Sequence, residues 1–182
     1  MNGRIVGAGV LAGLVVFAWS AISHMALPLG EMGVSALPAA EAVQPVLNSN
    51  VPQGGLYYFP WEKDPAKQEE ALRANARGIL VLTPATEPFS FGKLLATEAA
   101  TNIAGGIFAA FLFAAAGLGT AGIGRQLAFG ATLGGFASLA IDFSYWNWYG
   151  FPLNYVAAQL VDAVVAWSLA ALVMGLVLKN RA

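Results

Sequence analysis

Two long apolar blocks meet at the stretch IDFSYWNWYGFPLNY, residues Ile141–Tyr155, which holds seven aromatic residues and one acid. Glycine permits a positive φ and proline cannot continue the preceding helix, so Gly150 and Pro152 predict a tight turn between two helices. Trp and Tyr side chains favour the headgroup level of a bilayer, where the ring stays in an apolar layer while its N–H or O–H reaches water. The stretch therefore predicts a helical hairpin in a membrane, with its turn at one surface.

The composition of the whole chain agrees with a membrane protein. Of its 182 residues, 58% are hydrophobic and 10% are charged, against roughly 45–50% and 25% in soluble domains. Four apolar blocks reach the roughly 20 residues that a helix needs to cross a hydrocarbon core about 30 Å thick. These blocks are Ile5–Leu27, Leu94–Gly117, Leu127–Trp148 and Pro152–Leu178. The sequence predicts a mainly α membrane protein, a bundle of four transmembrane helices.

The first block also resembles a signal peptide, because Arg4 precedes its apolar run and Ala18-Trp19-Ser20 before Ala21 fits a cleavage site. Its apolar run continues to Leu27, which is longer than the usual apolar region of such a peptide. We therefore expect residues 1–28 to remain as the first transmembrane helix.

Residues 29–90 contain no spanning block and predict a small extracytoplasmic α+β cap between the first two membrane helices. Helix starts are expected near Ser35, as a cap, and at Asp64, which is followed by proline at the first helical position. Short strands are expected over Gly55–Trp61 and Gly78–Pro84, which are rich in aromatic and β-branched residues. A cap of this size has little core of its own, so we expect it to pack against the aromatic hairpin or against a partner.

The distribution of cations predicts the orientation of the helices. Short segments decide topology, and they carry their Lys and Arg on the cytoplasmic side. One side would hold Arg4, Arg125, Lys179 and Arg181 with no acid. We therefore expect cytoplasmic N- and C-termini. Residues 91–182 then form helices two to four, with a cytoplasmic turn at 117–126 and an outer aromatic hairpin at 143–155.

Several classes of function are excluded by composition. A net charge of −1 gives no basic face for nucleic acid. The absence of cysteine excludes disulfides, thiol nucleophiles and Cys-ligated metals. A single histidine, His24, cannot build a His-rich metal site, so no metal ligands are predicted. The sequence identifies no cofactor.

Polar side chains inside the spans carry most of the functional information, because they are costly in a bilayer. Glu98 and Asn102 stand four residues apart on one helix face. Tyr155, Gln159 and Asp162 follow a helical stripe. The candidate ligand-binding residues are His24, Glu98, Asn102, Asp142, Tyr145, Trp146, Trp148, Tyr155, Gln159 and Asp162.

The depth of these residues limits what they can do. All lie in the outer half of the spans or near the midplane, and the inner halves contain no ionisable group, so we expect neither a channel nor a pump. The acids either lock helix packing as protonated or hydrogen-bonded carboxyls, or form a site for a ligand, cation or proton. For Asp162 we expect a hydrogen bond to Gln159 or to the second helix. Ser23 and His24 with Asp142 supply the residue types of a catalytic triad, but their spacing alone proves nothing.

Helix contacts are indicated by two glycine pairs, Gly9/Gly13 and Gly130/Gly134, which fit the small-residue packing motif. Together these features predict a small integral subunit, or an accessory or scaffolding protein, of a larger complex in the bacterial inner membrane. Its expected partners are the lipid bilayer and other membrane subunits or further copies of itself. Two alternatives stay open: an outer-leaflet binding protein for a lipid, quinone or pigment, and an intramembrane enzyme.

Overall fold

A computed structural model describes residues 3–179 of the chain, 72% of which is helical. The elements in chain order are α1 (Gly3–Met25), the 3-10 turn η1 (Pro28–Gly30), α2 (Ala40–Asn50), β1 (Gly55–Phe59), α3 (Pro65–Ala74), β2 (Gly78–Leu82), α4 (Phe91–Ala115), the 3-10 turn η2 (Leu118–Thr120), α5 (Ile123–Tyr149) and α6 (Leu153–Leu178). Four of them, α1, α4, α5 and α6, are long and apolar enough to cross a membrane. The prediction of a mainly helical protein with four such helices is confirmed. Arg181 lies outside the described residues.

The described chain divides into two compact units. The helical unit comprises residues 3–34, 90–146 and 151–179, and the small unit comprises Ser35–Phe89 with Asn147–Gly150. Residues 29–34, which the sequence assigned to the cap, belong to the helical unit. Gly33 has a φ of 78° there and packs so tightly on Tyr155 of α6 that an added Cβ would collide with it.

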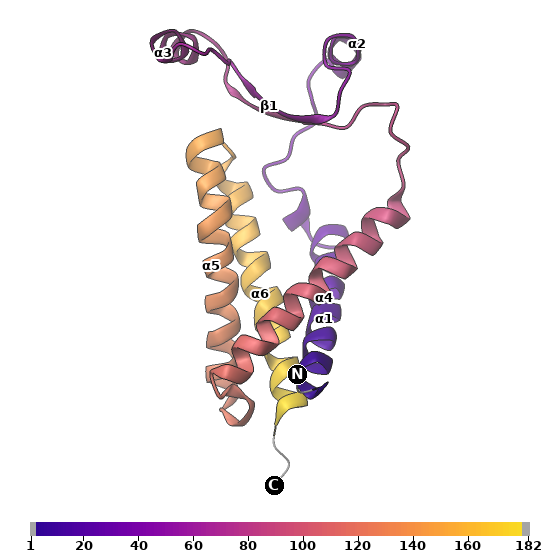
Figure 1. The fold of residues 1–182 in the computed structure, drawn as a ribbon, viewed down its shortest axis with the longest axis vertical. Coiled ribbons are helices and arrows are strands. Elements are labelled where there is room, and N and C mark those ends of the chain that lie inside the picture. The colour runs from indigo at the N-terminus through magenta and orange to yellow at the C-terminus, as the bar shows by residue number, and fades with distance from the viewer. Residues whose placement is uncertain (1–2, 180–182) are drawn as a thin grey trace. The chain divides into compact units, whose positions relative to one another are not determined.

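Within the helical unit, α4 crosses α1 (Figure 1), and glycines lie where the two backbones meet. A Cβ added to Gly9 or Gly13 would overlap the α4 backbone at Ile107 or Ile103, and one added to Gly106 would overlap α1. Only glycine lets two helix backbones approach this closely. The first glycine pair therefore lies at a helix crossing, as its spacing indicates.

The second glycine pair forms a seam between α5 and α6. Gly130 faces the backbone of Trp167, and Gly134 faces that of Ala163. The buried residues of α5 recur every four positions along this one face. They are Gln126, Gly130, Gly134 and Ser138.

The core of the helical unit is built mainly from alanine, with a few large side chains. Phe113 of α4 and Met174 of α6 are fully buried. Phe113 packs edge-to-face on Phe129 of α5, with ring centroids 5.5 Å apart. Small side chains thus allow close packing, while large apolar residues such as Phe108 and Phe136 stay exposed on the outside of the helices. That distribution fits helices in lipid.

Both ends of the described chain lie at the same end of the helical unit, which we call the terminal end (Figure 1). The Arg4 guanidinium of α1 donates hydrogen bonds to the carbonyl oxygens of Val177, at 2.9 Å, and Lys179, at 3.3 Å. The turn η2 packs there too, because a Cβ on Gly119 would meet the Leu178 carbonyl at 2.9 Å. Four long helices, an even number, give this arrangement.

The small unit alternates helix and strand in the expected order. Its strands β1 and β2 pair antiparallel, with Tyr57 opposite Leu80. Asp64 caps α3 through a 3.0 Å hydrogen bond from the Ala66 amide, as predicted. The expected Ser35 cap is wrong: α2 begins at Ala40, after Ala39 in a left-handed conformation without a side-chain cap.

Candidate functional site

The best-defined polar contact between membrane helices joins α1 to α6. Trp19 Nε1 donates a 2.8 Å hydrogen bond to Asp162 Oδ1, and both side chains are half-buried. An indole nitrogen only donates, so the carboxyl group accepts here whether it is ionised or protonated. The prediction for Asp162, a hydrogen bond to Gln159 or to an oxygen of α4, is wrong: the partner is Trp19. The sequence does not predict this role of Trp19, because Trp19 lies within the apolar first block. One feature of the sequence could have indicated the bond: Trp19 has an indole donor and lies at a depth similar to that of Asp162, an acid with no cation nearby.

A second polar group lies near the end of α1. The Ser23 side chain is fully buried, and its Oγ lies 3.2 Å from the Ser20 carbonyl oxygen and 2.9 Å from His24 Nδ1. His24 Nδ1 also lies 3.0 Å from the Ser20 carbonyl oxygen. Gly30 of η1 packs against the imidazole, where an added Cβ would stand 2.8 Å from a ring carbon. These contacts are local to one helix end, and they hold the ring in place.

The pair on α4 forms as its spacing predicts. Asn102 Nδ2 donates a 2.9 Å hydrogen bond to Glu98 Oε1, and Thr101 Oγ1 donates to the Glu98 carbonyl oxygen at 2.9 Å. Glu98 is exposed and Asn102 is half-buried, next to the α1 crossing at Gly13. No hydrogen bond between described residues links this pair to Asp142 or Asp162.

Three aromatic rings contact one another in tilted arrangements where α5 and α6 approach each other. The Phe151 ring lies between those of Tyr145 and Tyr155, with centroid distances of 5.3 and 5.4 Å. Asp142 lies close enough to Tyr155 to interact with it electrostatically. The three rings therefore pack against one another between the ends of α5 and α6.

The remaining candidates are more dispersed. Trp146 packs edge-to-face on Phe143 at 6.4 Å, whereas Trp148, at the end of α5, is 71% exposed. Gln159 is half-buried on α6. The antiparallel register set by Gly130 and Gly134 places Gln159 at the level of Ser138, whose buried Oγ has no hydrogen-bond partner in the described chain. The candidate residues thus form separate groups, and ligand binding by them stays a prediction.

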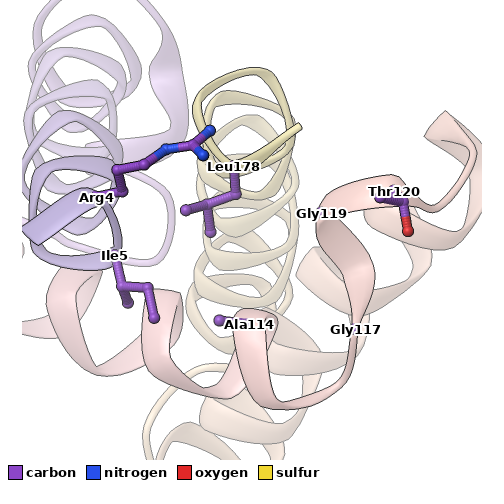
Figure 2. A pocket seen from close by; sticks show the side chains of 7 residues that line it. All are labelled: Arg4, Ile5, Ala114, Gly117, Gly119, Thr120 and Leu178. Carbon is purple, nitrogen blue, oxygen red and sulfur yellow. The ribbon is translucent and has the colours of Figure 1, made fainter. Parts of the chain in front are cut away.

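Two cavities lie at the terminal end of the helical unit. The first, of about 230 Å³, is lined by Arg4, Ile5, Ala114, Gly117, Gly119, Thr120 and Leu178 (Figure 2). The second, of about 530 Å³, is lined by the turn Gly119–Ile123 together with Gln126, Leu172, Gly175, Leu176 and Lys179. Gln126 is buried, and its Nε2 donates to the carbonyl oxygens of Leu118 and Ala121 at 3.2 and 3.1 Å. The sequence does not predict this role, because Gln126 lies at the end of the expected cytoplasmic turn, 117–126.

The chemistry open to these groups is limited by their separation. Ser23 and His24 contact each other, but no hydrogen bond in the described chain joins the imidazole to Asp142 or to another carboxylate. Among the described residues, no three His, Asp or Glu side chains gather as metal ligands would. Among these groups, the Trp19–Asp162 bond joins two helices, whereas the Ser23–His24 and Glu98–Asn102 contacts each lie within one helix.

Comparison with models of protein families, with curated proteins and with solved structures finds no match to this chain.

Proposed function

We propose that this protein is a small integral subunit or accessory protein of a larger assembly in the bacterial inner membrane. The observation that carries the proposal is the lack of a core in the small unit. None of the residues Ser35–Phe89 is buried, although the segment forms two helices and a sheet. A two-stranded ribbon is marginally stable at best without a surface to pack on.

The ribbon of β1 and β2 is apolar on both faces. Side chains alternate along a strand, so Leu56 and Val81 share one face, and Tyr57 and Leu80 share the other. Leu56 is 69% exposed and Val81 is 73% exposed. Such apolar surface marks interaction sites, and the two strands also leave open edges. These features support a docking surface for a partner protein.

Helix α5 offers a second contact surface. Only 17% of its most apolar stretch is buried, against 28% for α1 and α6. Small residues recur along the face away from the α6 seam, at Gly124, Ala128, Ala131 and Gly135. A Cβ added to Gly124 or Gly135 would meet nothing within 4 Å. Small-residue faces suit close packing of a neighbouring membrane helix.

The proposal includes the orientation with both termini in the cytoplasm and the small unit outside. Arg4, Arg125 and Lys179 support it, because they lie at the terminal end or in the first turn of α5. Of the described acids in the helical unit, none lies there. This asymmetry is the one that cytoplasmic segments show. The proposed role is not catalytic.

Gentle solubilisation and native mass spectrometry of the full chain test the proposal. We expect a complex with an identifiable partner or further copies of this chain. Leu56→Asp and Val81→Asp should abolish that complex, while Lys67→Asp on the exposed face of α3 should retain it. A stable monomer from gentle extraction, or equal retention by all three variants, would contradict the proposal.

A further inference from the structure

We propose that the larger cavity at the terminal end binds one anionic phospholipid. Its volume, about 530 Å³, falls in the range of ligand sites, which is about 300–1,000 Å³. The cavity lies between the turn that precedes α5 and the last two turns of α6. This inference goes beyond the proposed role as a subunit, since it concerns a ligand rather than a protein partner.

The α6 side chains that line the cavity change from apolar to cationic toward the end of the helix. Leu172, Leu176 and Lys179 lie on one face of the helix, at spacings of four and three residues. A rise of about 1.5 Å per residue puts Lys179 roughly 10 Å from Leu172 along the axis. A phosphate group at Lys179 would therefore place its acyl carbons against Leu176 and then Leu172. Ile123 supplies apolar surface from α5.

The backbone at Lys179 is held by a hydrogen bond from α1. Arg4 donates to the carbonyl oxygens of Val177 and Lys179, so it holds the end of α6 in place (Figure 2 shows its guanidinium beside Leu178). Gln126 fixes the opposite wall through its hydrogen bonds to the turn. The cavity thus has walls that are set by hydrogen bonds on both sides.

The charge at this end selects an anionic headgroup. Arg4, Arg125 and Lys179 are cations, and the described acids of the helical unit, Glu31, Glu98, Asp142 and Asp162, all lie in other parts of it. The first turn of α5 contains no acid. A zwitterionic headgroup would place its own positive group near these three cations, which is unfavourable. Basic pockets between membrane helices are typical sites for acidic lipids.

The experiment measures lipid retention by the full-length protein. Purified protein in mild detergent is mixed with phosphatidylglycerol or with phosphatidylcholine of identical acyl chains, and bound lipid is counted by native mass spectrometry. We expect one phosphatidylglycerol to be retained preferentially. Lys179→Gln should lower its apparent affinity about fivefold, the effect of one cation near an anionic lipid. Lys93→Gln, at the start of α4, is the matched control and should leave it unchanged.

A second pair of variants tests the apolar part of the cavity. Leu176 is 78% exposed, so Leu176→Trp can fill the cavity without disturbing the core, and Leu112→Trp is its control on the surface of α4. We expect only the first to reduce retention. Equal binding of the two lipids, equal effects of the paired variants, or full displacement by millimolar inorganic phosphate would overturn the proposal. The last result would mean an anion site that needs no acyl chain.

Discussion

At the scale of single residues, the bond between Trp19 and Asp162 explains how an acid is accommodated well inside an apolar helix. The Asp162 carboxyl group has no cation in the described hydrogen-bond network, but it accepts from an indole N–H on a helix far away in sequence. A polar group without a partner in such surroundings would be destabilising. The same contact therefore fixes the rotation of α1 and α6 relative to each other.

Substitutions at Asp162 should separate the hydrogen bond from the charge. Asp162→Asn retains an oxygen that accepts from Trp19, so we expect little change in stability. Asp162→Leu removes the acceptor and should destabilise the protein by about 0.6 kcal/mol and at most about 1.7 kcal/mol, the average and the maximum for hydrogen bonds between membrane helices. Thermal unfolding in a single detergent measures both.

Trp19→Phe provides the control for this prediction, because it removes the donor and keeps an aromatic ring. Its effect combined with Asp162→Leu should be smaller than the sum of the two single effects. Strict additivity, or equal tolerance of Asn and Leu at position 162, would show that the bond does not contribute to stability.

At the scale of elements, the helices associate through glycines where backbones meet. Gly9 and Gly13 face α4, whereas Gly7 on the same helix would have nothing within 4 Å of an added Cβ. Gly7 and Gly9 therefore lie on the same helix but differ in whether another helix packs against them.

Gly9→Ala should destabilise the protein by about 1–3 kcal/mol, because the new methyl group would overlap the α4 backbone. Gly7→Ala should be neutral or slightly stabilising, since alanine favours helix. Unfolding of the two variants under identical conditions checks this. A neutral Gly9→Ala would mean that α1 and α4 pack differently.

Two adjacent glycines on α5 distinguish packing inside the chain from packing with a partner. Gly134→Leu should destabilise the fold, because Gly134 faces the backbone of Ala163. Gly135→Leu should leave the fold intact but reduce retention of the proposed partner, since Gly135 lies on the open small-residue face. Native mass spectrometry and unfolding together separate the two effects. A partner retained in full by Gly135→Leu would remove α5 from the proposed interface.

The sequence predicts the helices well because apolar length alone decides whether a segment can span a bilayer. The block Pro152–Leu178, for example, corresponds to α6 at Leu153–Leu178. It does not predict neighbours in space: periodicity identifies the polar face of α6, but not that Trp19 would meet it. The start of α2 was missed for a related reason, since Ser35 is a good cap in isolation while the chain turns later, at Ala39.

At the scale of the whole molecule, the helical unit has an even number of candidate spans and brings Arg4 and Lys179 together. The two chain ends therefore lie on one side of the membrane, if every candidate helix crosses it. The cations at the terminal end support the proposal that this side is the cytoplasmic one.

Single cysteines can test this orientation directly, because the natural chain contains none. Asn75→Cys, at the end of α3, and Thr120→Cys, in η2, are both exposed positions. The cells are stripped of their outer membrane, with the inner membrane left intact, and treated with a membrane-impermeant maleimide. We expect labelling at position 75 only. Both should react after the membrane is permeabilised. Labelling of position 120 alone in intact cells would reverse the proposed topology.

The contact between α1 and α6 also has a consequence for biosynthesis. Trp19 and Asp162 are separated by 143 positions along the chain, so the ribosome makes nearly the whole polypeptide before the indole meets its acceptor. During that interval the face of α1 that packs on α6 is uncovered, and α4 is the first long helix available to contact α1. The last helix to emerge therefore completes the bundle, and translation that stops before Leu153 leaves the first helix without its contacts to α6.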